Sequence, residues 1–184
     1  TVTLGQPDST RFHGRHDDDG WQVTVLDTGL ETMTGARIKQ AQSHVTADRF
    51  MVTYGDGVAN VDVAALVAHH TQAGRLATVT GVRPPARFGE LVIEGDRVVE
   101  FSEKPQIQQG LINGGFFVFE RAAFEYLSAD PTCVLEREPL ERLAADGQLS
   151  LYQHDTFWRC MDTFRDLQAL NQLWHSQSAP WKTW

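Results

Sequence analysis

The chain has 184 residues, 41% of them hydrophobic, and a formal net charge of −8. This is enough for one domain with a packed core, and the acidic charge argues against nucleic acid as a partner, because a phosphate backbone selects a basic surface. No run approaches the roughly 18 apolar residues that span a bilayer, no signal peptide is evident, and two cysteines without metal-like spacing favour a reduced, cytoplasmic protein with no membrane partner.

The first half of the chain alternates predicted strands and helices after a polar segment. Residues 1–20 lack hydrophobic periodicity, so we expect a mobile loop there and a single domain over residues 21–184. The alternation of elements predicts parallel strand pairing with right-handed crossovers. The predicted strands cover residues 21–27, 49–54 and 76–82, and the predicted helices cover residues 35–44 and 61–71.

The second half begins with a hairpin signal, because residues 90–93 and 97–101 flank the turn sequence Glu94-Gly95-Asp96. Further strands are predicted at residues 111–119 and 149–154, and further helices at residues 121–127, 139–146 and 162–176.

Asp56 is the first candidate functional residue. It lies in Gly55-Asp56-Gly57, directly after the predicted strand 49–54. Open α/β sheets bind ligands at the carboxyl ends of their strands, and a carboxylate there suits Mg²⁺, which prefers hard oxygen ligands. The same three residues are also typical of an ordinary turn. Asp162 is a second candidate carboxylate, and it could equally cap the last helix.

The glycines of Asn113-Gly114-Gly115 interrupt a predicted strand. Glycine in a strand interior often marks close approach of a ligand or of another backbone segment. A β-bulge is the alternative interpretation of this motif.

Ten segments in the same order resemble the sugar-nucleotide pyrophosphorylase family of nucleotidyltransferases. Tyr54-Gly55-Asp56-Gly57 and Pro180-Trp181-Lys182-Thr183-Trp184 favour its glucose-1-phosphate cytidylyltransferase branch. The resemblance implies an α/β fold with a mixed, mostly parallel sheet flanked by helices, similar to glycosyltransferase-A-like nucleotide-binding domains. The matching segments are residues 25–29, 33–37, 54–58, 84–91, 101–105, 112–118, 138–140, 157–158, 161–166 and 180–184.

The resemblance also implies a reaction. A glucose 1-phosphate oxygen attacks the α-phosphate of CTP, so that CDP-glucose forms and pyrophosphate leaves, in a homo-oligomeric enzyme. Such a transfer depends on positioning and charge neutralisation. By resemblance, Asp56 and Asp162 bind Mg²⁺, and Lys104 holds the sugar phosphate. The implied sugar contacts are Tyr54, Glu103, Asn113, Gly114, Gly115 and Trp158, and the implied CTP contacts are Thr32, Gly35, Arg37 and Gly55.

One family feature has no counterpart in this sequence. The family opens with a strand, a Gly-Gly-x-Gly-Thr-Arg loop and a lysine, which cradle the triphosphate, so we expect an N-terminally incomplete fold with impaired turnover. Two other hypotheses stay open. The first is a non-catalytic module that binds sugar phosphate. The second is a glycosyltransferase that uses a nucleotide sugar, although its Asp-x-Asp pattern occurs only in the loop sequence Asp17-Asp18-Asp19.

Overall fold

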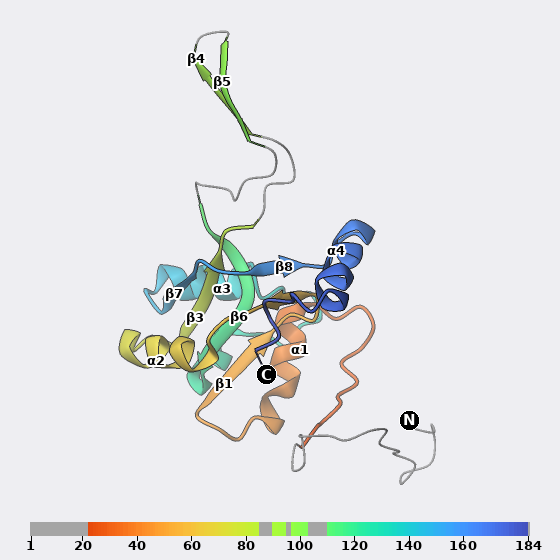
Figure 1. Cartoon of the computed structure of the whole chain (residues 1–184). Helices are drawn as coiled ribbons and strands as arrows, with labels where there is room; N and C mark the ends of the chain where they lie inside the picture. Colours follow the sequence, from red (N-terminus) through yellow and green to blue (C-terminus); the bar gives the residue numbers. More distant parts are fainter. Residues whose placement is uncertain (1–21, 85–89, 95–96, 103–109, 184) are drawn as a thin grey trace.

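The computed structural model describes residues 22–84, 90–94, 97–102 and 110–183 as an α/β arrangement with a mixed central sheet (Figure 1). The elements, in chain order, are α1 (Thr34–Gln40), η1 (Ala41–His44), β1 (Arg49–Thr53), β2 (Gly57–Ala59), α2 (Val63–Ala73), β3 (Ala77–Val82), β4 (Glu90–Glu94), β5 (Arg97–Ser102), β6 (Ile112–Glu120), η2 (Arg121–Tyr126), α3 (Glu138–Ala145), β7 (Leu149–His154), β8 (Trp158–Cys160) and α4 (Phe164–His175).

The central sheet has the strand order β1-β6-β3-β7. β1, β3 and β7 point in one direction, because β3 and β7 pair in parallel while β6 runs antiparallel to both β1 and β3. The predicted parallel pairing between the strands at 49–54 and 76–82 is therefore wrong. The strand β6, which follows them far along the chain, inserts between them and supplies their hydrogen-bonding partner.

One face of the sheet carries the apolar core. Alternate residues of each strand point to this face, and the paired residues Ala77 and Phe119 mark its centre. The Phe50 ring stacks on Phe119 at 5.4 Å between centroids and on Phe124 of η2 at 4.6 Å. The fully buried Phe124 alone contributes on the order of 2–3 kcal/mol of hydrophobic stabilisation. The buried members of the core are Ala77, Phe117, Phe119, Ala123, Leu135 and Leu143.

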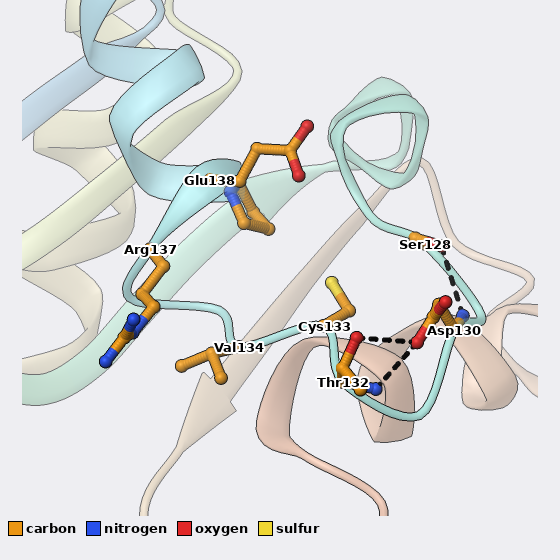
Figure 2. Close-up of a pocket in the computed structure, with 8 residues that line it drawn as sticks. Ser128, Asp130, Thr132, Cys133, Val134, Arg137 and Glu138 are labelled. Atoms are coloured by element: carbon orange, nitrogen blue, oxygen red, sulfur yellow. Dashed lines mark hydrogen bonds between the residues drawn. The ribbon is translucent and has the colours of Figure 1, made fainter.

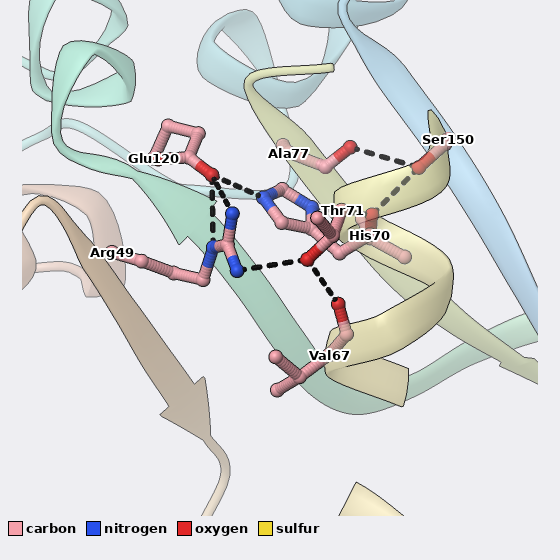
Figure 3. A network of polar contacts seen from close by, with 8 residues as sticks. Arg49, Val67, His70, Thr71, Ala77, Glu120 and Ser150 are labelled. Atoms are coloured by element: carbon pink, nitrogen blue, oxygen red, sulfur yellow. Dashed lines mark hydrogen bonds and ion pairs between the residues drawn. The ribbon is translucent and has the colours of Figure 1, made fainter. Parts of the chain in front are cut away.

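The opposite face carries a buried polar network beneath α2 (Figure 3). His70 is only 1% exposed. Its Nδ1 lies 2.7 Å from the Thr78 hydroxyl, which lies 2.6 Å from the Ser150 hydroxyl. Its Nε2 lies 3.1 Å from Oε1 of Glu120, and Arg49 donates to the same oxygen through Nε and Nη2 at 2.8 and 2.6 Å. The network joins α2 to β1, β3, β6 and β7.

Burial decides the protonation of this network. Desolvation lowers the pKa of His70 below its ordinary value of 6.5 and outweighs the opposing hydrogen bond to Glu120. Burial acts to raise the pKa of Glu120, but hydrogen bonds from Arg49 and His70 outweigh it and hold the pKa below 4.5. A neutral His70 therefore donates through Nε2 to the Glu120 carboxylate and accepts the Thr78 hydroxyl proton at Nδ1.

Two short antiparallel ladders accompany the sheet. β2 pairs with β8, and β4 pairs with β5 in the predicted hairpin, which extends away from the central sheet (Figure 1). The β2–β8 ladder places two segments that are far apart in the sequence side by side, and it lies next to α4 (Figure 1).

One predicted element is wrong, and one prediction is outside the described residues. Residues 22–27 form no strand, although they alternate, and Val23 and Val25 are 80% and 89% exposed. Alternation alone cannot supply the hydrogen-bonding partner that a strand needs. The predicted mobile loop at residues 1–20 is outside the described ranges. The other predicted elements are present, with ends displaced by a few residues and with η2 as a 3₁₀ helix in place of the helix predicted at 121–127.

Candidate active site

The β2–β8 ladder brings together the chain segments that carry the two candidate carboxylates. Gly57 pairs with Cys160 in this ladder, and beyond that pair the Met161 amide donates to the Asp56 carbonyl at 2.8 Å. Asp56 directly precedes β2, and Asp162 follows Met161, so both leave the same end of one ladder. Both side chains are exposed. Carboxylate oxygens are the kind of ligand that suits Mg²⁺, which normally keeps several waters and takes substrate phosphates as further ligands.

Asp162 does not cap α4. The cap is Thr163, whose side chain accepts from the Asp166 amide at 3.2 Å, while Asp166 accepts from the Thr163 amide at 3.1 Å, which completes a capping box. The alternative of a helix cap for Asp162 is therefore wrong. The Cys160 thiol donates to Asp162 Oδ2 at 3.2 Å. Burial and this hydrogen bond raise the pKa of the Cys160 thiol to about 11, so it stays a donor at neutral pH.

Tyr54, Asn113, Gly114, Gly115 and Trp158 meet beside this ladder. The Tyr54 amide donates to the Gly115 carbonyl at 3.0 Å, and the Asn113 amide nitrogen donates to the Tyr54 hydroxyl at 3.1 Å. The Trp158 indole donates to the Gly114 carbonyl at 2.7 Å. The five predicted sugar contacts that the structure describes are thus one connected group, at the end of β1, within β6 and at the start of β8.

The glycine run forms a β-bulge in β6. The register between β3 and β6 shifts between Val79 and Gly81, because extra residues of β6 are accommodated there. Gly115 has φ +78°, a left-handed conformation that favours glycine, and an added Cβ would lie 2.8 Å from the Tyr54 ring. At Gly114 an added Cβ would lie 2.7 Å from Val82. The bulge alternative is confirmed, and both glycines are required by contacts within the protein.

Glu136 is the residue of this group that the sequence prediction missed. Its Oε1 accepts from the Tyr54 hydroxyl, and its Oε2 accepts from Thr34 Oγ1 at 3.0 Å. Burial and this carboxylate raise the pKa of Tyr54, so the phenol remains protonated and donates. Glu136 is an exposed residue in the loop before α3. No local pattern marks such a residue, although its neighbours Glu138-Pro139-Leu140 belong to the segments that resemble the family.

Three of the four predicted nucleotide contacts, Thr32, Gly35 and Arg37, lie in or just before the first turn of α1. Arg37 donates through Nε to the Thr32 carbonyl at 2.7 Å, through Nη2 to the Leu30 carbonyl at 3.1 Å, and through Nη1 to the Thr28 hydroxyl. These bonds show that Arg37 holds the loop before α1. An added Cβ at Gly35 would lie 2.7 Å from Cys133 Sγ, so Gly35 allows α1 to pack closely on the loop between η2 and α3.

Three further predicted residues receive no contact role from the structure. Gly55 lies beside Asp56, and an added Cβ would meet no atom within 4 Å. Lys104 and Glu103 are outside the described residues, so their predicted contacts with the sugar phosphate and sugar hydroxyls stay predictions.

A separate cavity of ≈ 330 Å³ lies along the loop between η2 and α3 (Figure 2). Its carboxylate at Asp130 accepts from the Thr132 amide at 2.8 Å and from the Thr132 hydroxyl at 2.7 Å. These hydrogen bonds lower the pKa of Asp130, and they occupy its carboxylate with a residue of the same turn. The cavity is lined by Ser128, Asp130, Thr132, Cys133, Val134, Arg137, Glu138 and Pro139, and no predicted site residue is among them.

Two further findings concern partners. Among the residues that the structure describes, no group of three or more histidine, cysteine, aspartate or glutamate side chains could hold a metal ion. Within the same described ranges, none of the helices combines the length and apolar character that a membrane crossing requires.

A family model described as nucleotidyl transferase matches residues 15–177. The chain therefore belongs to the nucleotidyl transferase family. It is 45% identical over 165 residues to the glucose-1-phosphate cytidylyltransferase of Salmonella typhi. The matched residues cover 89% of this chain and 64% of that protein. It is 40% identical over 181 residues to a Bacillus subtilis (strain 168) protein named probable glucose-1-phosphate cytidylyltransferase, which covers 98% of this chain and 66% of that protein.

The fold is similar to that of solved structures with lower sequence identity. HddC from Yersinia pseudotuberculosis superimposes with a TM-score of 0.58 at 20% identity, over 78% of this chain and 63% of that structure. This likeness shows the fold. The chain spans just under two thirds of the length of the curated relatives that it matches.

Proposed function

We propose that the protein is a cytidylyltransferase that forms CDP-glucose and pyrophosphate from CTP and glucose 1-phosphate. The observation that supports this proposal best is the backbone pairing of Asp56 with Met161, next to Asp162, at one end of the β2–β8 ladder. The ladder lies beside the connected group of Tyr54, Asn113 and Trp158. The cytidylyl specificity rests on the two relatives with that name.

Each group has a proposed role in the transfer. The sugar-phosphate oxygen forms a bond to the α-phosphorus of CTP, the bond from that phosphorus to the bridging oxygen breaks, and pyrophosphate leaves. Mg²⁺ bound by Asp56 and Asp162 would neutralise phosphate charge. Lys104 would hold the sugar phosphate as a point charge. Glu103 and Asn113 would contact sugar hydroxyls, and the remaining amide N–H of Asn113 is suited to that role, since its oxygen already accepts from the Gly115 amide at 2.8 Å.

The nucleotide side and the assembly complete the proposal. Thr32, Gly35 and Arg37 would contact CTP from the first turn of α1, and Gly55 would contact it beside Asp56. We also propose a cytoplasmic homo-oligomer. Trp181 of the C-terminal segment packs on Phe157 within the same chain, with ring centroids 5.3 Å apart. Trp181 of that segment therefore makes a contact inside one subunit.

The test measures pyrophosphate release from CTP, glucose 1-phosphate and Mg²⁺, with UTP, GTP, ATP and dTTP in parallel, together with calorimetric binding of CDP-glucose in the presence of Mg²⁺. We expect CTP to be preferred and CDP-glucose to bind in a manner that EDTA abolishes. Asp56→Asn should lower metal-dependent binding and turnover at least 100-fold, because one of two charged metal ligands is lost.

Asp48→Asn is the matched control. Asp48 is an exposed aspartate that precedes β1, at the opposite end of the strand from Asp56. It should leave binding and turnover within about twofold of the parent. If another nucleotide were preferred, the cytidylyl assignment would be wrong, and the protein would be assigned to the branch of the family that uses that nucleotide. Absence of both turnover and metal-dependent binding would favour the hypothesis of a non-catalytic module and overturn the proposal.

A further inference from the structure

We infer that Glu136 is a positioning residue that couples the nucleotide side of the proposed site to its sugar side. The inference rests on the proposed function and adds to it a residue outside the predicted contacts. Glu136 bridges two elements with its two carboxylate oxygens: it accepts from Thr34 at the start of α1 and from Tyr54 at the end of β1. The two bridged elements carry different groups of candidate contacts.

The loop that carries Glu136 is fixed to α1. The Met33 amide donates to the Pro131 carbonyl at 2.8 Å, and the Ala36 amide donates to the Cys133 carbonyl at 3.2 Å. Thr34 Oγ1 accepts from the Leu135 amide at 3.0 Å before it donates to Glu136. The loop and the first turn of α1 therefore form one hydrogen-bonded unit, and Glu136 extends from this unit toward Tyr54.

The sugar side continues the same chain of hydrogen bonds. The Tyr54 hydroxyl donates to Glu136 and accepts from the Asn113 amide at 3.1 Å, and the Asn113 oxygen accepts from Gly115 at 2.8 Å. The orientation of Asn113, which fixes the direction of its remaining N–H, thus depends on where Tyr54 is held. Glu136 is the anchor that sets the position of the Tyr54 hydroxyl.

On the nucleotide side, α1 holds the loop that precedes it. Arg37, three residues after Thr34, donates to the carbonyls of Thr32 and Leu30. A change in the position of Thr34 therefore alters the position of the proposed CTP contacts. Both ends of this arrangement depend on Glu136. Its loss should therefore weaken the binding of both substrates, although Glu136 is not among the proposed substrate contacts.

A carboxylate suits this position better than an amide. Thr34 and Tyr54 are both hydroxyl donors toward Glu136, and a carboxylate accepts from both, whereas a glutamine side chain has one acceptor oxygen and one donor nitrogen. Thr34 also accepts from the Leu135 amide, so its hydroxyl proton must point to another acceptor. Glutamine therefore preserves the size of the side chain and disrupts one of the two hydrogen bonds.

The test compares the full chain with Glu136→Gln, Glu136→Ala and the control Glu138→Gln. Glu138 is exposed and makes an i,i+4 contact with Arg142 at 3.6 Å. Glu138→Gln therefore removes a nearby negative charge and leaves the bridge between Thr34, Glu136 and Tyr54 intact. Initial rates are measured while CTP and glucose 1-phosphate are varied separately, and CDP-glucose binding is measured by calorimetry. We expect kcat/KM for each substrate to fall about tenfold in Glu136→Gln and 10- to 100-fold in Glu136→Ala, the range for a hydrogen bond to a charged group.

A double-mutant cycle separates positioning from mere stability. The effects of Thr34→Val and Glu136→Gln on kcat/KM should be less than additive, because each substitution breaks the same bridge from α1 to Tyr54. The thermal midpoint of Glu136→Gln should stay within about 2 °C of the parent, since the side chain is exposed. Unchanged kinetics and binding in Glu136→Ala, or a loss restricted to one substrate, would overturn the inference alone. A parent chain that neither turns over nor binds CDP-glucose would overturn the proposed function, and the inference with it.

Discussion

The Trp158 indole donates to the Gly114 carbonyl at 2.7 Å, and this bond links the short β2–β8 ladder to the central sheet. The Gly114 carbonyl belongs to the bulge of β6, where the regular ladder with β3 is interrupted. Trp158 therefore supplies a side-chain donor where the register of β3 and β6 shifts. The same residue fixes the ladder that holds Asp56 and Asp162.

Trp158→Phe should lower the free energy of unfolding by about 1–3 kcal/mol, because the ring is largely retained while a buried carbonyl loses its partner. Urea denaturation followed by circular dichroism measures this change. Trp174→Phe is the control, since Trp174 is 46% exposed and contacts Lys182 at 5.1 Å over its ring. The control should change stability by less than about 0.5 kcal/mol. Equal effects of the two substitutions would contradict the anchoring role.

Gly115→Ala should destabilise the protein by roughly 1–3 kcal/mol and displace Tyr54, because the new Cβ meets the Tyr54 ring in a left-handed conformation. Gly110→Ala separates the two causes. Gly110 has φ +89°, but an added Cβ there meets no atom within 4 Å. Its cost should be limited to backbone strain of about 1 kcal/mol. A Gly115→Ala protein as stable as Gly110→Ala would show that the contact with Tyr54 relaxes without cost.

Stability should fall in acid as the buried network beneath α2 titrates. The pKa of His70 is lower in the folded state than its ordinary 6.5, so the unfolded chain binds more protons as pH falls below about 6.5. The stabilisation that His70 contributes is therefore fully present above that pH. It is lost as the pH falls toward the pKa of His70 in the folded state. Glu120 acts in the same direction at lower pH, from 4.5 downward, because its folded pKa is also lowered.

Urea midpoints between pH 8 and pH 4 measure this dependence. His70→Gln should remove the part of the slope that begins near pH 6.5, whatever its effect on stability at pH 8. His175→Gln, an exposed residue in the last turn of α4, is the control and should keep the slope. A wild-type midpoint that is constant from pH 7 to pH 5 would contradict the assignment of a neutral, buried His70.

The start of α4 gives a test that separates a structural residue from a site residue one position away. Thr163→Ala should lower the free energy of unfolding by about 1 kcal/mol, because the capping box is lost. Asp162→Asn should change it by less than about 0.5 kcal/mol but should weaken Mn²⁺ binding, which isothermal titration calorimetry detects. The reverse pattern, with stability lost at Asp162 and metal binding lost at Thr163, would make Asp162 the structural residue.

Local patterns predicted most of the elements but not their pairing. The strands at 49–54 and 76–82 are short apolar runs, and neighbouring residues are enough to indicate such runs. Their common partner β6 is far along the chain, and no periodicity in either run indicates it. Residues 22–27 illustrate the reverse, because they have a strand-like pattern and no strand partner among the described residues.

The site shows the same division. Asp56 and Asp162 were predicted together from segments that resemble the family, and the β2–β8 ladder pairs the backbone of these two segments. Glu136 was missed, since its role depends on hydroxyl groups from α1 and β1 that only the folded chain brings to it. Arg37 was predicted as a nucleotide contact, and the structure adds three hydrogen bonds within its own loop.

The β2–β8 ladder also has a consequence for folding kinetics. It joins residues from the first third of the chain to residues near its end, so it can form only after a long loop has closed. Contacts of such high sequence separation form slowly. A cation held between Asp56 and Asp162 would bind only after that closure and would stabilise the native state by mass action. Metal affinity would therefore report on the folding of the whole domain, and chelation should increase the rate at which the ladder opens.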